Sequence, residues 1–106
     1  MSYRFVRILV FFDLPMKTAA ERRAYAQFRK HLVKSGYMML QESVYCKLAP
    51  NQTVVDAQID NLRKNKPPAG MIEVLTITEK QFARMEMIVG SRQGDIVNTA
   101  ERFVEL

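Results

Sequence analysis

The sequence lacks the residues on which small disulfide-bonded or metal-bound domains depend. It has no tryptophan, one cysteine and one histidine among 106 residues. A single cysteine, Cys46, excludes an internal disulfide and a cysteine-rich zinc site, and it suits a reducing compartment. Because His31 is the only histidine, a metal site built from several histidines is excluded as well.

Long apolar runs and targeting signals are also missing. No apolar stretch approaches the ~20 residues that cross a bilayer. The first four residues lead directly into a strand-like segment, without the apolar core of a signal peptide. We therefore expect a soluble, cytoplasmic protein without a membrane partner, folded as a single domain over residues 1–106.

Positive charge is concentrated in the first half of the chain. The 16 basic and 11 acidic residues give a formal net charge of +5. Residues 1–53 hold nine of the basic and three of the acidic side chains, whereas residues 54–106 hold seven and eight. This asymmetry indicates a polyanionic partner.

Residue types and helix breakers predict an order of elements. Strands are expected at 3–14, 37–40, 42–48, 71–78, 84–89 and 103–106, and a tight turn or bulge joins the second and third. A capping box at Thr18 and Glu21 opens a helix that Gly36 ends. A second helix runs from Asn51 to the prolines at 67–68, and a helical turn covers 79–82. The order βαββαβ predicts an α+β, ferredoxin-like sandwich with extra C-terminal strands.

Two of these strands are apolar on both faces. In 8–12 and in 71–77 apolar side chains occupy both alternating sets of positions, yet two helices cover only one face of a four-stranded sheet. We therefore expect a homodimer that packs sheet face on sheet face about a two-fold axis. The extension 91–106 is expected to add a strand to the partner subunit or to its own.

The first predicted helix separates its apolar and basic side chains. Tyr25, Phe28 and Leu32 fall on one side. The residues expected to contact nucleic acid are the opposite row of Arg23, Lys30 and Lys34, the flanking Arg22 and Arg29, and Lys17 before the helix. The alternative is an ordinary solvated face, but Glu21 is the only acidic residue from 14 to 41.

Asp13 ends the first predicted strand, where its carboxylate could bind a metal ion. In a dimer two copies would face each other, and a cation between them would relieve their repulsion. Mg²⁺ or Mn²⁺ suits such oxygen ligands and could activate water against a phosphodiester. The alternative is an aspartate that only accepts backbone N–H groups before a turn. Ser43 and Tyr45 either hydrogen-bond a phosphate or pack.

These segments together resemble a known family. Phe12-Asp13-Leu14-Pro15, the basic helix from Glu21 to Leu32, and Gln41-Glu42-Ser43-Val44-Tyr45 are similar to the small "Cas-two" proteins of CRISPR adaptation, in the form of type II systems. The resemblance covers nearly the whole chain, including the segment 75–82.

The resemblance implies a ferredoxin-like homodimer that bridges two dimers of the spacer integrase and holds a double-stranded DNA protospacer. It also implies a Mg²⁺-dependent endonuclease, often an endoribonuclease, with Asp13 as the catalytic metal ligand and Arg22, Arg23 and Arg29 matching helix arginines of the family. Two alternatives from the residues alone remain open. One is a toxin-type metal-dependent ribonuclease of the same fold, and the other is an RNA-binding module of the RRM type.

Overall fold

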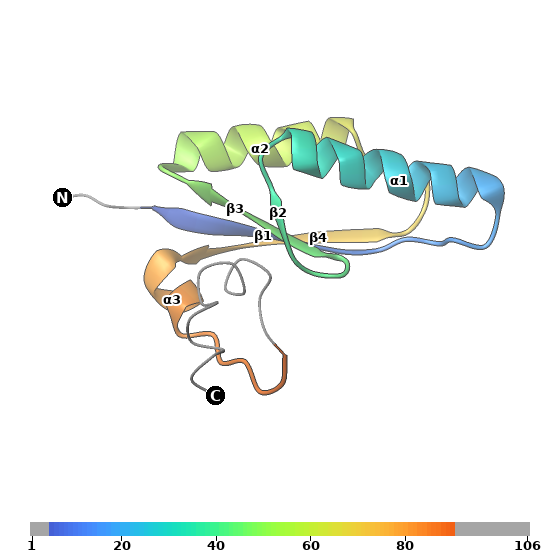
Figure 1. Ribbon diagram of the computed structural model, residues 1–106. Coiled ribbons are helices and arrows are strands. Elements are labelled where there is room, and N and C mark those ends of the chain that lie inside the picture. Colours follow the sequence, from blue (N-terminus) through green and yellow to red (C-terminus); the bar gives the residue numbers. More distant parts are fainter. Residues whose placement is uncertain (1–4, 91–106) are drawn as a thin grey trace.

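The computed structural model describes residues 5–90, which form four strands and three helices (Figure 1). The elements are β1 Val6–Asp13, α1 Ala19–Lys34, β2 Met38–Gln41, β3 Val44–Ala49, α2 Gln52–Lys64, β4 Met71–Thr78 and α3 Glu79–Ala83. The strands pair in one antiparallel sheet in the order β2-β3-β1-β4. This arrangement confirms the expected ferredoxin-like α+β class. The strand expected at 103–106 and the extension 91–106 lie outside the described residues.

Local signals fix the ends of both long helices. The Thr18 hydroxyl accepts a hydrogen bond from the Glu21 backbone N–H, and the Glu21 carboxylate accepts one from the Thr18 backbone N–H, which completes the predicted capping box. Asn51 caps α2 by accepting from the Val54 N–H at 2.9 Å. Gly36 follows α1 with φ of +94°, a conformation that favours glycine.

The core lies between the sheet and the two long helices, which cover the same face (Figure 1). Its largest fully buried side chains are Tyr45, Phe28, Ile8, Leu32, Val10, Val55 and Cys46. All of these except Cys46 belong to the cluster beneath the helices. None of the helices in residues 5–90 has the length and apolarity that crossing a bilayer requires.

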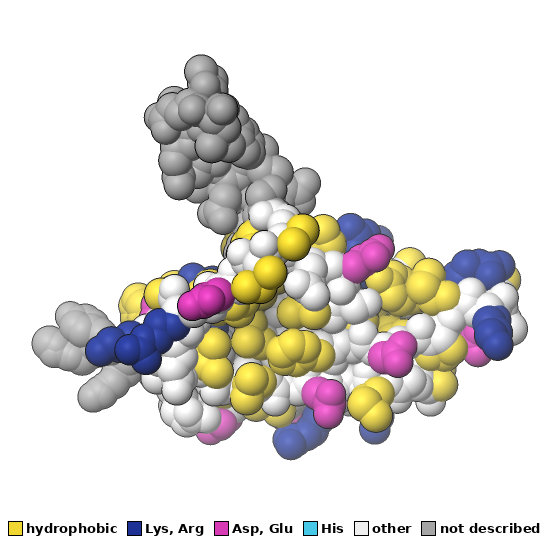
Figure 2. Space-filling view, turned by 90° about the horizontal axis from the view of Figure 1, so that it is seen from below, with side chains coloured by type: hydrophobic (Ala, Val, Ile, Leu, Met, Phe, Trp, Pro, Cys, Tyr) yellow, Lys and Arg dark blue, Asp and Glu magenta, His cyan; other side chains and the backbone are white. Residues whose placement is uncertain are grey.

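The other face of the sheet, which we call the open face, is rich in apolar side chains. Directly opposed residues of an antiparallel pair share a face, so Leu9 lies on the open face with Cys46 and Leu75. Figure 2 shows hydrophobic side chains gathered on this side. Four of them are 41–60% exposed, namely Met38, Leu48, Met71 and Leu75. The two-faced pattern is therefore confirmed, whereas the second copy that would cover this face stays a prediction.

The strand expected at 84–89 is wrong. After α3 the Arg84 and Met85 N–H groups bond back to Gln81 and Phe82, and the chain then continues to Gly90 without strand pairing. Residues 85–90 line a pocket together with Leu40 and Gln41, beside β2. A strand needs a neighbouring strand with which to form ladder hydrogen bonds, and α3, which lies below the sheet, turns the chain across the open face instead (Figure 1).

Candidate functional site

Asp13 is an exposed residue at the end of β1, and it lies on the open face. Its register partner is Met71, the first residue of β4. A shallow pocket of about 220 Å³ surrounds this strand end. It is lined by Phe11, Phe12, Asp13, Ser43, Val44, Met71 and Glu73. The carboxylate is thus accessible from solvent at the place where β1, β3 and β4 meet.

A second carboxylate, Glu73, lines the same pocket, and the sequence analysis did not single it out. Glu73 is paired with Phe11, so it lies diagonally from Asp13 on the same face. Such diagonal neighbours are about 7–8 Å apart between Cα atoms. The signal was present, because Glu73 is the only charged residue in 71–78 and shares the alternation of Met71 and Leu75.

Ser43 sits at the turn between β2 and β3, beside Asp13. Its φ of 68° makes it the only described non-glycine residue with a left-handed backbone. Its carbonyl oxygen accepts a hydrogen bond of 3.0 Å from the Phe12 N–H, which ties the turn to the end of β1. Ser43 lines the pocket, so it lies where a phosphate near Asp13 would come.

These residues fit one hard cation. Mg²⁺ and Mn²⁺ favour oxygen ligands, and Mg²⁺ keeps several waters while taking one or two protein carboxylates. Asp13 and Glu73 supply two such groups, and neither has an ion pair with another described residue. Within residues 5–90 no three of His, Cys, Asp and Glu lie together as a metal site. A full protein cage is thus absent from this part of the chain, and a partly hydrated ion is the form that fits.

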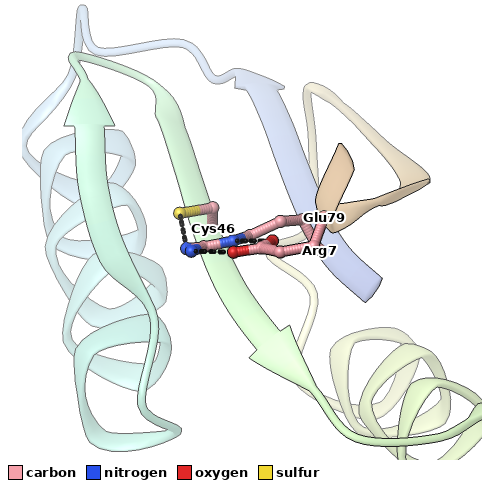
Figure 3. Close-up of polar contacts among 3 residues, drawn as sticks. All are labelled: Arg7, Cys46 and Glu79. Atoms are coloured by element: carbon pink, nitrogen blue, oxygen red, sulfur yellow. Dashed lines mark hydrogen bonds and ion pairs between the residues drawn. The ribbon is translucent and has the colours of Figure 1, made fainter. Parts of the chain in front are cut away.

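A separate polar cluster on the open face holds α3 against β1 (Figure 3). The Arg7 guanidinium donates two hydrogen bonds of 2.7 Å to the Glu79 carboxylate and lies 4.4 Å from the centre of the Phe82 ring. Its remaining nitrogen is 3.7 Å from the Cys46 sulfur. The hydrogen bonds to Glu79 raise the pKa of Arg7, and those from Arg7 lower the pKa of Glu79. The cluster is structural and lies apart from the Asp13 pocket.

Four of the predicted nucleic-acid contacts are free. Each of these residues is exposed and has no ion pair or hydrogen bond from its side chain to another described residue. They are Lys17, Arg23, Lys30 and Lys34. Charges without a partner among residues 5–90 are available to a polyanion.

Arg22 is held by the loop before α1. Its Nη1 donates to the carbonyl oxygens of Met16 at 3.2 Å and Lys17 at 2.9 Å. The neighbouring Glu21 accepts from the N–H groups of Lys17 and Thr18. Both contacts fix the loop that joins Asp13 to α1, while the Arg22 side chain stays exposed.

Arg29 is held by a hydrogen bond to a core residue. Its Nε donates a hydrogen bond of 2.8 Å to the hydroxyl of Tyr45, a residue of β3 that is 2% exposed. The Tyr45 ring lies 5.7 Å from Phe12 among the core residues. This position favours the packing alternative for Tyr45 over a direct phosphate contact. The pairing was not foreseen, because no local pattern links 29 to 45.

The comparisons with known proteins point in one direction. A family model described as "CRISPR associated protein Cas2" matches residues 6–85. Three similar proteins carry the name CRISPR-associated endoribonuclease Cas2. The protein from Treponema denticola is 52% identical over 95% of this chain and all of its own length. That from Streptococcus mutans is 46% identical over 95% and 93%, and that from Acidovorax ebreus is 46% identical over 80% and 83%. A match of this extent shows that the chain belongs to the CRISPR-associated Cas2 family.

Proposed function

We propose that this protein acts in CRISPR adaptation as a homodimer that holds a DNA duplex between dimers of the spacer integrase. The observation that carries the proposal is the row of free cations on α1, formed by Arg23, Lys30 and Lys34. At about 100° per residue these three fall within about 40° on the side opposite Phe28 and Leu32. They therefore form a line of positive charge that can follow a phosphate backbone without reading its sequence.

The apolar open face supports the dimeric form of the proposal. Exposed apolar patches of this kind mark contact surfaces in soluble proteins, and a two-fold contact joins identical patches. Pairing at Leu75 and Met71 would leave both α1 helices outward. Two lines of cations on one particle can grip one duplex, which one subunit alone would hold more weakly.

Charge reversal tests the duplex contact. Arg23→Glu with Lys30→Glu should abolish most binding of a labelled duplex and reduce the salt dependence of the binding constant. The slope of log K against log salt should fall by roughly 3–4 if both copies lose two contacts each. The matched control is Arg63→Glu with Lys64→Glu on α2, which changes the net charge equally. Equal loss in both variants would mean that net charge acts without a specific surface.

Assembly is tested by solution mass. The protein, a CRISPR spacer integrase and a short duplex should give a complex whose mass contains two copies of this chain. A chain that never joins the integrase would point to the toxin-type ribonuclease instead.

A second candidate function is metal-dependent cleavage of a phosphodiester at Asp13. It is favoured by the accessible pair of carboxylates, Asp13 and Glu73, in one pocket, and by the endoribonuclease named in the relatives. A bound Mg²⁺ or Mn²⁺ would polarise the phosphate and lower the pKa of a water ligand. Asp13 and Glu73 would hold the ion, and Asp13 of a second copy would complete the two-fold pair. The Ser43 hydroxyl would donate one hydrogen bond to the phosphate.

Cleavage is tested with Asp13→Ala against Asp56→Ala, an exposed aspartate of α2. RNA and DNA substrates are incubated with Mg²⁺, with Mn²⁺ and with EDTA. Activity that needs the metal, survives in Asp56→Ala and disappears in Asp13→Ala supports the enzyme. Identical cleavage by the wild type and Asp13→Ala identifies a contaminant.

A further inference from the structure

The basic residues of α1 differ in one respect that their sequence does not reveal. The side chains of Arg23, Lys30 and Lys34 have no hydrogen bond or ion pair to another described residue, whereas Arg29 is anchored at Nε by the buried Tyr45 hydroxyl at 2.8 Å. Arg29 is nevertheless an exposed residue, and no described residue bonds to its two terminal nitrogens. A guanidinium bound only through Nε keeps four N–H groups on those nitrogens.

The anchor itself is rigid. Tyr45 is the second residue of β3, opposite Val10 of β1, and its ring packs beside Phe12. Phe12 in turn contacts Phe28, on the helix turn that carries Arg29, at 5.3 Å between ring centres. The hydroxyl is thus fixed by the sheet and the helix at once, and it gives Arg29 one preferred orientation.

We propose that Tyr45 is a positioning residue for nucleic-acid binding, and that it acts by orienting Arg29 for a two-point contact with a phosphate. Arginine binds phosphate through two parallel N–H groups, and an arginine already held in place loses less side-chain entropy when it does so. The free cations supply attraction, while the anchored arginine sets where the backbone lies. This inference rests on the proposed function of duplex binding.

Arg22, about two turns before Arg29, is also held by hydrogen bonds through its guanidinium group. It lies seven residues before Arg29, which places it about 10 Å along the helix and about 20° around it. Its Nη1 is held by the carbonyls of Met16 and Lys17. The flank of α1 therefore presents two guanidinium groups held by hydrogen bonds, whereas the cations of the outer row have no such contact with a described residue.

The decisive variant is Tyr45→Phe, which keeps the ring in the core and changes no charge. Binding of a fluorescein-labelled 24-bp DNA duplex of arbitrary sequence is measured by anisotropy in EDTA, which separates binding from cleavage. We expect affinity to fall about three- to tenfold, while the salt slope stays unchanged because the number of cations is unchanged. Arg29→Lys should give a similar loss. The double variant should bind no more weakly than either single one, because both remove the same oriented group.

The matched control is Arg63→Lys, which makes the same change at an exposed arginine of α2 and should alter affinity less than twofold. Thermal melting shows that each variant is folded, and Arg29→Lys keeps the test valid if Tyr45→Phe does not fold. An independent readout is the exchange of the Arg29 Nε proton by NMR, expected to be slow in the wild type and fast in Tyr45→Phe.

Different results would overturn the positioning role of Tyr45 and the proposed duplex binding. Wild-type affinity in Tyr45→Phe, additive losses in the double variant, or a fast-exchanging Nε proton in the wild type would overturn the positioning role and leave duplex binding intact. A wild-type protein that binds no duplex at low salt would overturn the proposed function, and the positioning role with it.

Discussion

At the scale of single residues, two buried tyrosines have opposite surroundings. The Tyr45 hydroxyl is hydrogen-bonded by Arg29, whereas the Tyr37 hydroxyl is buried without a partner among the described residues. Tyr37 is 4% exposed, and burial raises its pKa to about 12. A buried hydroxyl that has lost water and gained no partner costs about 1–3 kcal/mol. Tyr37 is therefore a weak point of the core at neutral pH and a larger one in alkali.

The raised pKa of Tyr37 predicts that the protein loses stability as the pH rises above 10. The pKa of Tyr37 in the folded state lies above its unfolded value of 10.0, so the neutral form favours folding below pH 10. The free energy of unfolding should then fall from about pH 10 to 12, by roughly 2–3 kcal/mol in total. Tyr37→Phe should remove this fall and keep or increase stability at pH 7. Urea unfolding at pH 7 and pH 11 measures both effects.

The control for this prediction is Tyr25→Phe, a half-buried tyrosine of α1. It should keep the alkaline loss of the wild type. A Tyr37→Phe protein that loses stability with pH as the wild type does would assign the effect to another group.

Residue-level prediction from the sequence succeeded where the cause was local. The place of Asp13 follows from the strand that precedes it and the proline after it. The register of β4 against β1 is what brings Glu73 to the pocket, and the Arg29–Tyr45 hydrogen bond joins a helix to a strand residue sixteen positions later in the chain. Such contacts depend on how elements pack, which residue types alone do not determine.

At the scale of elements, α3 is the clearest case of tertiary control. Five residues are too few for a stable isolated helix. A capping box of Thr78 and Gln81 starts it, and the Arg7–Glu79 ion pair fastens it to β1. The residue pattern predicts the helical turn but not the ion pair with Arg7, and the predicted strand at 84–89 is wrong.

Glu79→Gln should loosen this element. Arg7 lowers the pKa of Glu79, so the pair stabilises the fold above the unfolded value of 4.5, and the contribution disappears as pH falls below it. The effect should be about 1 kcal/mol or less, because the Glu79 side chain is 43% exposed and water screens the pair. Melting curves from pH 7 to pH 3 should show a lower wild-type advantage at the acid end.

The element-level control is Asp60→Asn, which breaks the exposed i, i+4 pair with Lys64 on α2. That change should shift melting less than Glu79→Gln does, since both of its partners are more exposed. A larger effect for Asp60→Asn would mean that α3 contributes little to the stability of the sheet.

At the scale of the whole molecule, the two layers predicted from apolar periodicity correspond to the described fold. The helix-facing side chains of β1, Ile8, Val10 and Phe12, are buried as expected. On the open face the same strand keeps Leu9 buried, while Met71 and Leu75 of β4 stay exposed. The periodicity thus predicted which residues need cover, and it could not say what supplies it.

If a second copy covers the open face, one charge there should separate the subunits. Leu75 is 51% exposed, so pairing would bury about half of a side chain whose full burial is worth about 1.5–3 kcal/mol, and a symmetric pair counts that half twice. Leu75→Glu would lose this and bury two carboxylates near the axis. The affinity of the two subunits for each other should fall at least ~100-fold, since every 1.4 kcal/mol is a factor of ten. Sedimentation equilibrium over a range of concentrations measures the change.

Val33→Glu supplies the comparison, because Val33 is equally exposed at 56% but belongs to α1, on the other side of the sheet. It should sediment as the wild type does. A wild-type chain that stays a monomer at high concentration, or a Leu75→Glu variant that pairs as tightly as Val33→Glu, would show that the open face is not where two copies meet. The Asp13 pair and the paired α1 helices would then lose their common basis, since each depends on that contact.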